Sequence, residues 1–506
     1  VTITGAGTDQ TLIEWAAAVP DSDPLTGDRI FHVQIAAGAS ANIASVVIQD
    51  LAVRNGEVGL IPTAASGTGD LDPVNDTNAY DIEVVNSTAG SIAIWQFRRM
   101  GGAIALGAGY AVVLYEETTH GAGGAPVGGG GQGGPFPGGK PGEEAGFTID
   151  NVTLNRVAVV GSWSGADGGG VYSAVPSTIA TSIVSGNTSN ANGGGIYNDA
   201  VMSMTDTTVG KLFDAAAPAE LTQPNTAENG GGLFDTGSHT TTIAGSAING
   251  NSAIGGGAIA GRAGITIDMD NSTVSGNSAT DVGGGITTNG TVNLRNVTVM
   301  DNVATTDAPG GGAGLNAFGP GVFNIVNTVL QNNRKVPLPP ALPELVNCGC
   351  SGGGACAAGI MVSAGSNLED GDTCDLDVAT LQDQINADAL LGVLQDNGGL
   401  TETHAIGSGS PVIDAGDDAV CLTLVGLYGD VDQRGTGFPR RTDGNGDRVT
   451  ACDIGAVEAP AVGGGGGGGG GGCVAAAGRG YDPMFLLFLA AAAGYRLLRR
   501  RTLGWR

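Results

Sequence analysis

The chain of 506 residues carries 49 acidic and only 21 basic side chains, which gives a formal net charge of −28 at pH 7. A surface this acidic repels polyanions and therefore disfavours a nucleic-acid partner. Glycine supplies 92 residues and aromatic residues only 5% of the chain, a composition that suits closely stacked turns better than a large globular core.

The first 55 residues contain three short stretches that predict strands, at 1–7, 29–33 and 44–55. The last of these ends in a polar turn, as later parts of the chain do, and we interpret all three as the first coils of a repeat structure. The chain begins at Val1 without a signal peptide. Because its tail requires export, we expect that an export signal was removed or that the sequence is a fragment.

Residues 56–146 are less regular. Strands are expected at 82–85 and 111–115. Two stretches, 56–80 and the Gly/Pro-rich run 120–146, are expected to be loops that leave the coils, because such sequences cannot bury a core.

A short glycine phrase recurs along residues 167–333. Its six copies begin at Gly168, Gly193, Gly230, Gly255, Gly283 and Gly310. Their spacings of 25, 37, 25, 28 and 27 residues indicate a repeat architecture, in which each unit stacks on its neighbours and buries a shared core. We assign the longest spacing to a loop at 210–229 that leaves one coil.

Each repeat has the pattern of a short strand followed by a polar turn. Apolar and polar residues alternate at 265–267, 292–294 and 323–325, so one face can be buried. Asn tolerates left-handed turns, and stacked Asn side chains can hydrogen-bond from layer to layer. We therefore expect two structural columns: Asn151, Asp206, Asn271, Asn296 and Asn327 in the first, and Asn187, Asn251, Asn277, Asn302 and Asn333 in the second.

Two other repeat folds fit less well. A helical solenoid would need longer runs of Ala, Leu, Glu and Lys than these repeats contain. A propeller blade would need about 40–45 residues per unit. The sequence thus predicts an all-β chain in which residues 1–335 form a right-handed parallel β-helix, the pectin lyase-like fold.

Six cysteines lie close together after the repeats, and a seventh stands apart at Cys473. No spacing typical of a zinc site is present, so we expect disulfides in an oxidising compartment, with the pairing left open. The six candidates are Cys348, Cys350, Cys356, Cys374, Cys421 and Cys452.

Residues 336–460 begin with a Pro-rich stretch and differ from the repeats. They contain, in order, LQDNGG at 394–399, THA at 403–405, GSPVIDAG at 409–416, DQRG at 432–435 and CDIGAVE at 452–458. On these motifs the region resembles the bacterial choice-of-anchor Q domain. The resemblance implies a surface protein with β-helix repeats upstream and an anchoring signal downstream, and it implies no reaction.

The tail combines a glycine-rich linker at 461–480, which contains Cys473, with an apolar run and arginines at 481–506. The apolar run is short against the ~20 residues of a permanent membrane span, and arginines after it would stay in the cytoplasm. The tail resembles the JDVT-CTERM, MYXO-CTERM and GlyGly-CTERM sorting tails. This implies an intramembrane sorting protease as partner, with processing or lipid transfer near Cys473. A plain membrane anchor with a free cysteine is the alternative.

Candidate chemistry is sparse. Parallel β-helices include polysaccharide lyases and glycoside hydrolases, but fold analogy alone supports catalysis here. Asp268 and Asp270 would share a face of a strand, which is common by chance. Asp443, Asn445 and Asp447 place oxygen ligands at alternate positions, and with Asp453 they are a candidate Ca²⁺ site. An Asx-rich turn without metal is the alternative.

We therefore expect an exported protein on the surface or outer membrane of a Gram-negative bacterium, or released from it. It would display a rod for adhesion or for binding a glycan or a neighbouring cell, without catalytic residues or a cofactor other than the candidate Ca²⁺. A polysaccharide lyase or glycoside hydrolase on the same scaffold is the first alternative. A structural envelope protein is the second.

Overall fold

The computed structural model describes residues 151–462 apart from 165–166, 214–216, 307–309, 337–341 and 352–355, and before residue 151 it describes only the strands β1 to β9. Cys473, the predicted span in 481–506 and the predicted loop at 120–146 lie outside the described residues. Among the helices that are described, none is long and apolar enough to cross a bilayer.

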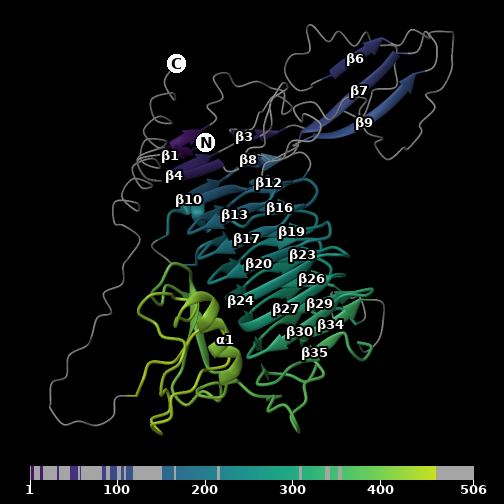
Figure 1. Cartoon of the computed structure of the whole chain (residues 1–506). Coiled ribbons are helices and arrows are strands. Elements are labelled where there is room, and N and C mark those ends of the chain that lie inside the picture. Colours follow the sequence, from purple (N-terminus) through teal and green to yellow (C-terminus); the bar gives the residue numbers. More distant parts are fainter. Residues whose placement is uncertain are drawn as a thin grey trace, which may run out of the picture.

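The described repeats form a stack of coils (Figure 1), and most coils contribute strands to three parallel sheets. This arrangement confirms the predicted parallel β-structure and fits a parallel β-helix. We name the sheets A, B and C. In chain order a coil passes from sheet A through the short strands of sheet C to sheet B.

Sheet A is the largest, and its strands are β1 (Thr2–Thr4), β2 (Leu12–Glu14), β4 (Val46–Arg54), β10 (Val152–Val160), β13 (Ser177–Ala180), β14 (Ile183–Ser185), β17 (Met202–Thr205), β18 (Thr208–Gly210), β20 (Thr240–Ala244), β21 (Ala247–Asn249), β24 (Thr266–Ser275), β27 (Thr291–Met300), β30 (Val322–Val326), β31 (Val329–Gln331), β35 (Met361–Ser363) and β36 (Leu368–Glu369). Sheet B contains β3 (Phe31–Val33), β8 (Ile104–Leu106), β12 (Val171–Ser173), β16 (Ile196–Asn198), β19 (Leu233–Asp235), β23 (Ile259–Gly261), β26 (Ile286–Thr288), β29 (Leu315–Phe318) and β34 (Cys348–Ser351). Sheet C contains β5 (Glu57–Val58), β11 (Trp163–Ser164), β15 (Thr188–Ser189), β22 (Ser252–Ala253), β25 (Ser278–Ala279), β28 (Val303–Ala304), β32 (Arg334–Lys335) and the antiparallel β33 (Glu344–Leu345).

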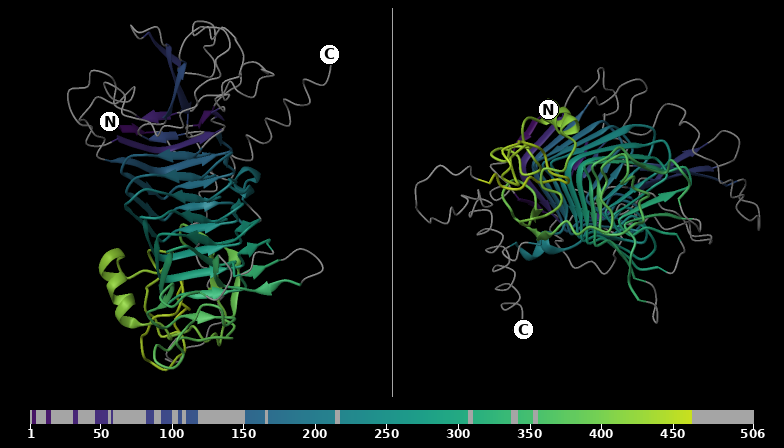
Figure 2. Two further views of the ribbon diagram at one scale, coloured as in Figure 1. Left: turned by 90° about the vertical axis from the view of Figure 1, so that its right-hand side faces the viewer. Right: turned by 90° about the horizontal axis from the view of Figure 1, so that it is seen from below.

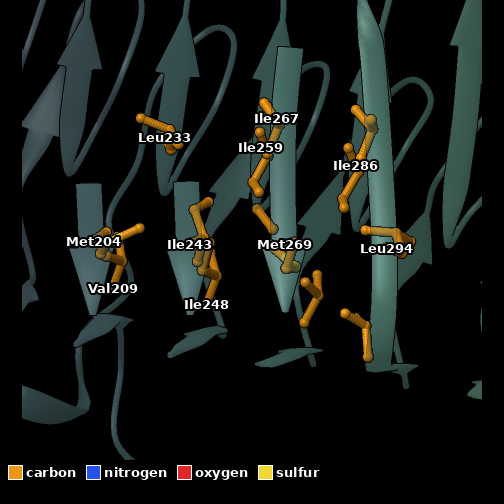
Figure 3. Packing of buried hydrophobic residues seen from close by; sticks show 14 of the residues in the cluster. Met204, Val209, Leu233, Ile243, Ile248, Ile259, Ile267, Met269, Ile286 and Leu294 are labelled. Atoms are coloured by element: carbon orange, nitrogen blue, oxygen red, sulfur yellow. The ribbon is translucent and has the colours of Figure 1, made fainter. Parts of the chain in front are cut away.

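The core is a set of apolar columns inside the coils. Met204, Ile243, Met269 and Leu294 occupy one register position of sheet A on successive coils, and each is fully buried. Side chains such as Ile259 of sheet B pack with them from the other side (Figure 3). Because parallel strands align in register, each column repeats the same inward position.

Glycine is required where the coils turn sharply. Gly193 has φ 67°, a conformation that L side chains rarely adopt. A Cβ on the next residue, Gly194, would lie only 2.5 Å from the carbonyl oxygen of Thr226 and 2.6 Å from that of Gly231 in the next coil. The phrase recurs because the backbones of successive coils approach this closely at the corner.

The coil stack continues past the predicted boundary at 335/336. Strand β34 pairs in parallel with β29, β35 pairs with β30, and β36 pairs with β31. Disulfides join two pairs of residues in these last coils: Cys348 with Cys374, and Cys350 with Cys356. The third disulfide joins Cys421 and Cys452, so all six predicted cysteines are paired.

A few elements lie outside the three sheets. Strands β6 (Ile82–Asn86), β7 (Ile92–Arg99) and β9 (Tyr110–Glu117) form a separate antiparallel sheet. The 3₁₀ helix η1 (Ala219–Thr222) lies in the predicted loop at 210–229, and bridges at Thr226 return the chain to the coils. Strand β5 lies within the predicted loop at 56–80 and pairs with β11 in sheet C, and the rest of that stretch lies outside the described residues.

The C-terminal segment, defined here as residues 370–459, turns back alongside the coils (Figures 1 and 2). It contains the antiparallel hairpin of β37 (Leu391–Gln395) and β38 (Thr403–Ile406). It also contains the helix α1 (Asp418–Tyr428), whose N-terminus is capped by the Asp417 side chain. Glu402, which precedes β38, accepts hydrogen bonds from the backbone N–H of Phe213 in the predicted loop at 210–229, at 2.8 and 3.0 Å.

Candidate functional site: the outer stripe of sheet A

A bend divides the strands of sheet A into two rows. Its residues have left-handed backbone conformations, with φ between 43° and 53° at Thr181, Asp206, Asn271, Asn296 and Asn327. Asn and Asp adopt this conformation more readily than most residues. The first row precedes the bend and the second row follows it, so the two rows present separate outer faces.

The C-terminal segment covers the outer face of the second row on β24 and β27, whereas Leu212 and Leu221 from the loop around η1 pack on the second row of β10. The Thr273 hydroxyl donates to Gln433 Oε1 at 2.6 Å. Ser275 Oγ lies 2.8 Å from His404 Nε2, and the Ala456 N–H donates to Thr298 Oγ1 at 3.1 Å. All five side chains are buried, so this face is an internal interface rather than a binding surface.

The outer face of the first row carries a line of polar side chains, which we name the outer stripe. Its members occupy one register position on seven successive coils and are all partly exposed: Thr153, Thr178, Ser203, Thr242, Asp268, Asn293 and Asn324. Because strands in a sheet lie about 4.8 Å apart, the stripe spans about 29 Å.

A second outward position lies two residues further along each strand. In the four coils of the stripe nearest the N-terminus, called the upper coils here, it holds Asn155, Ala180, Thr205 and Ala244. In the next two it holds Asp270 and Arg295. The upper part of the face is therefore built of short uncharged side chains, and the charges lie further down.

The lower part of the stripe is tied together by side-chain hydrogen bonds. Asn324 Nδ2 donates to Asn293 Oδ1 at 2.7 Å, and Asn293 Nδ2 donates to Asp268 Oδ1 at 2.6 Å. These contacts fix the three side chains across successive coils and leave fewer of their polar atoms available to a ligand.

Beside the stripe, Arg295 forms an ion pair that balances the negative charge of Asp270. Arg295 Nε and Nη2 donate to its two oxygens at 2.6 and 2.7 Å, and the Tyr428 hydroxyl donates to Oδ2 at 2.8 Å. The hydrogen bond that Arg295 donates to Asp270, together with the negative charges of Asp270 and Asp268, raises the pKa of Arg295. Burial, and then the negative charge of Asp270, raise the pKa of Tyr428. Asp268 and Asp270 do share the predicted face, but both Asp270 oxygens are occupied, and Arg295 and Tyr428 remain protonated at neutral pH.

The four candidate Ca²⁺ ligands do not come together as one group. In the part of the chain that is described, no three His, Cys, Asp or Glu side chains form a cluster that could hold a metal. Asp443 accepts from the backbone N–H groups of Gly446 and Arg448 at 2.7 and 2.9 Å. Asp453 is buried instead, and burial raises its pKa to about 6.

The remaining two loop positions also bond to the local backbone. Asn445 Oδ1 accepts from the Asp447 N–H at 2.8 Å, and Asp447 Oδ1 accepts from the Val449 N–H at 2.7 Å. The loop geometry is that of consecutive Asx turns.

The second predicted Asn column forms a buried ladder. Asn251 Nδ2 donates to Asn277 Oδ1 at 3.0 Å, and Asn277 Nδ2 donates to Asn302 Oδ1 at 2.9 Å. Asn302 Nδ2 donates in the same way to Asn333 at 2.9 Å. All of these side chains are almost completely buried. They hold the coils together and are not available to a ligand.

Two members of the ladder are missing from the sequence analysis. Asn187 Nδ2 donates to Asn225, and Asn333 Nδ2 donates to Asn347, at 3.0 and 2.9 Å. Asn225 follows the insertion, which hides its spacing. Its local signal is the tripeptide Asn-Xaa-Ala, which recurs at 225, 251, 277 and 302.

Asn151 does not belong to the first column, so that assignment is wrong. The register of β10 with β13 and β14 places Arg156, with φ 53°, opposite Thr181. Asn151 instead donates to Thr153 Oγ1 at 3.0 Å. The error arises because Asn-Val-Thr occurs at both 151–153 and 296–298 in different register positions.

Comparison of the chain with protein families, with curated proteins and with solved structures finds no match.

Proposed function

We propose that the protein is an exported rod on the bacterial surface, a right-handed parallel β-helix whose outer stripe binds glycans of a neighbouring cell or matrix. The observation that carries the proposal is the contrast between the two outer faces of sheet A. The C-terminal segment and the loop around η1 cover the second row, whereas the stripe is partly exposed on all seven coils.

Several features support export and rigidity. Three disulfides favour an oxidising compartment outside the cytoplasm. Crossover connections between parallel strands are almost always right-handed, which favours that hand for the coils. The fixed spacing of the coils would present polar groups at regular intervals without the entropy cost of ordering a flexible surface.

The resemblance of residues 336–460 to the choice-of-anchor Q domain supports attachment to the cell surface. In this proposal the tail passes through the membrane during export, and an intramembrane protease cuts it near Cys473. The proposed location is the surface or outer membrane of a Gram-negative bacterium.

Glycan binding can be tested with the purified full chain on an array of neutral and acidic polysaccharides. A bulky Ser203→Tyr substitution should abolish binding by covering the stripe. Ser278→Tyr is the matched control, because Ser278 is also a partly exposed serine on a coil strand, but in sheet C.

Three results would overturn the proposal. They are failure to bind any glycan, equal loss of binding in both variants, and self-association as the sole activity, which would favour a structural envelope layer. Release of shortened glycans by the wild-type chain would replace the proposal with the enzyme alternative.

A further inference from the structure

Resting on the proposed function, we infer that the ligand is a neutral, extended polysaccharide that lies along the stack and binds mainly to the upper four coils. We name this part of the face the upper platform. It comprises the two outward positions on β10, β13, β17 and β20: Thr153, Thr178, Ser203 and Thr242, with Asn155, Ala180, Thr205 and Ala244.

The shape of the upper platform suits a polymer rather than a compact ligand. Its side chains are short, and none is aromatic or charged. At a strand spacing of about 4.8 Å, four coils offer a strip about 14 Å long. Side chains this short leave a shallow face, which can contact an extended chain at many points but cannot enclose a small molecule.

Free hydroxyl groups supply the matching chemistry. Within the described residues, the hydroxyls of Ser203, Thr205 and Thr242 make no hydrogen bond. A hydroxyl is both donor and acceptor, so it can pair with sugar hydroxyls in either direction. These three side chains lie on the adjacent strands β17 and β20, where consecutive sugar units could reach them.

Charge selects against acidic glycans. The chain carries a net charge of −28, which repels polyanions. The upper platform holds no Lys or Arg to offset this, and further down the guanidinium of Arg295 already donates twice to Asp270. A neutral polysaccharide avoids this repulsion and can still form hydrogen bonds with the hydroxyl groups of the upper platform.

The register of the coils sets the direction of the ligand. Equivalent side chains repeat along the stack, so a polymer in that direction meets the same contacts on each coil. Across the strands the face changes within a few residues. In the lower coils the C-terminal segment borders it, since Tyr428 bonds to Asp270 and the Val431 carbonyl accepts from Asn271.

Many weak, equivalent contacts predict a steep dependence on ligand length. Each added sugar unit binds within a complex that already exists, so its contribution multiplies the affinity. Disaccharides should bind too weakly to measure, whereas hexasaccharides should bind.

The test compares two linear hexasaccharides, a neutral glucan and a uronate, by calorimetry on the full chain and on three variants. The triple variant Ser203→Ala, Thr205→Ala, Thr242→Ala should weaken glucan binding at least about tenfold, because it removes the three unbonded hydroxyls that would pair with the ligand. Ser278→Ala, on sheet C, should leave it unchanged. The double variant Thr178→Arg, Thr242→Arg should gain uronate binding.

The outcomes separate this inference from the proposed function. Uronate binding equal to or tighter than glucan binding in the wild type, or a triple variant that still binds glucan normally, would overturn the inference while leaving glycan binding intact. If neither hexasaccharide nor any longer glucan or uronate binds, the proposed function fails with it.

Discussion

At the scale of single residues, buried amides carry much of the cohesion between coils. Each ladder Asn accepts through Oδ1 from the coil before it and donates through Nδ2 to the coil after it. Asn277 Oδ1, for example, accepts from both the backbone N–H and Nδ2 of Asn251, at 2.9 and 3.0 Å. Burying an unpaired amide would destabilise the fold. In the ladder each buried amide is hydrogen-bonded, so it links neighbouring coils specifically.

Asn277→Ala should therefore destabilise the stack strongly. The substitution leaves the backbone N–H and one Nδ2–H of Asn251 without an acceptor inside the core. Each such orphaned group costs about 1–3 kcal/mol, so we expect a loss of roughly 3 kcal/mol, measured as a fall in the thermal or denaturant midpoint.

Asn293→Ala is the matched control on the outer stripe. Asn293 also bonds to side chains of both neighbouring coils, but it is partly exposed, so water can replace the lost contacts. We expect a cost below about 1 kcal/mol. Similar midpoints for the two variants would show that the buried ladder contributes little to stability.

At the scale of elements, the glycine corners set how closely coils can stack. Gly257 has no room for a side chain. An added Cβ would lie 2.5 Å from the Ser278 carbonyl oxygen, and it would also collide with the carbonyl oxygen of Gly284. Both obstacles are backbone atoms, which a side-chain rotation cannot move away.

Gly257→Ala should prevent normal stacking and sharply reduce the yield of folded protein. Gly426→Ala is the contrasting substitution, because Gly426 lies in α1 and an added Cβ there meets no atom within 4 Å. Replacing this helical glycine should stabilise the protein by up to about 1 kcal/mol. Circular dichroism and thermal melts of both variants would measure the difference. Equal behaviour of the two alanine variants would contradict this account of the glycine phrase.

The sequence predicts the elements that repeat and misses those that do not. Glycine spacing and alternating apolar residues were sufficient to predict parallel strands from 167 to 333, because each coil obeys the same steric rule. The coils at β34, β35 and β36 carry disulfides and Pro-rich connections instead, so periodicity could not find them.

The candidate site was beyond prediction for a related reason. Thr153, Thr178, Ser203 and Thr242 are ordinary outward residues of ordinary strands. They form a stripe only through the register of four coils, and the chain between Ser203 and Thr242 includes an insertion. The face also differs from its surroundings because the neighbouring row is covered by other parts of the chain. The local sequence of the strands does not predict that contact.

At the scale of the whole molecule, the C-terminal segment is part of the rod rather than a separate module beside it. The segment buries polar side chains of at least three coils, among them Asn249, Ser275 and Thr298. Because these groups have partners only in the docked arrangement, the coils and the segment should unfold together.

His404 makes this docking sensitive to acid. Its Nδ1–H donates to the Gly392 carbonyl at 2.7 Å, and Nε2 lies 2.8 Å from the Ser275 hydroxyl. In the neutral imidazole Nε2 accepts from that hydroxyl. Burial lowers the pKa of His404, although the Gly392 hydrogen bond and the charge of Asp301 oppose the shift. In the unfolded chain the pKa returns to about 6.5.

The sign of the pH effect follows from proton binding. As the pH falls below about 6.5, the unfolded chain takes up a proton at His404 that the folded protein does not, so the free energy of unfolding decreases. Asp453 and Glu458 act in the opposite sense. Burial raises the pKa of both, to about 6 for Asp453, so the folded state binds their protons first and gains stability on acidification.

A comparison of wild type with His404→Gln isolates the histidine, since both proteins retain Asp453 and Glu458. The variant should be less stable at pH 7.5, because it loses the hydrogen bonds of His404 with the Ser275 hydroxyl and the Gly392 carbonyl. This deficit should narrow at pH 5.5, because only the wild type then loses stability through His404. Urea midpoints at the two pH values measure the deficit. A constant deficit would mean that the pKa of His404 is the same in the folded protein and the unfolded chain, and a widening one would reverse the assigned direction of its pKa shift.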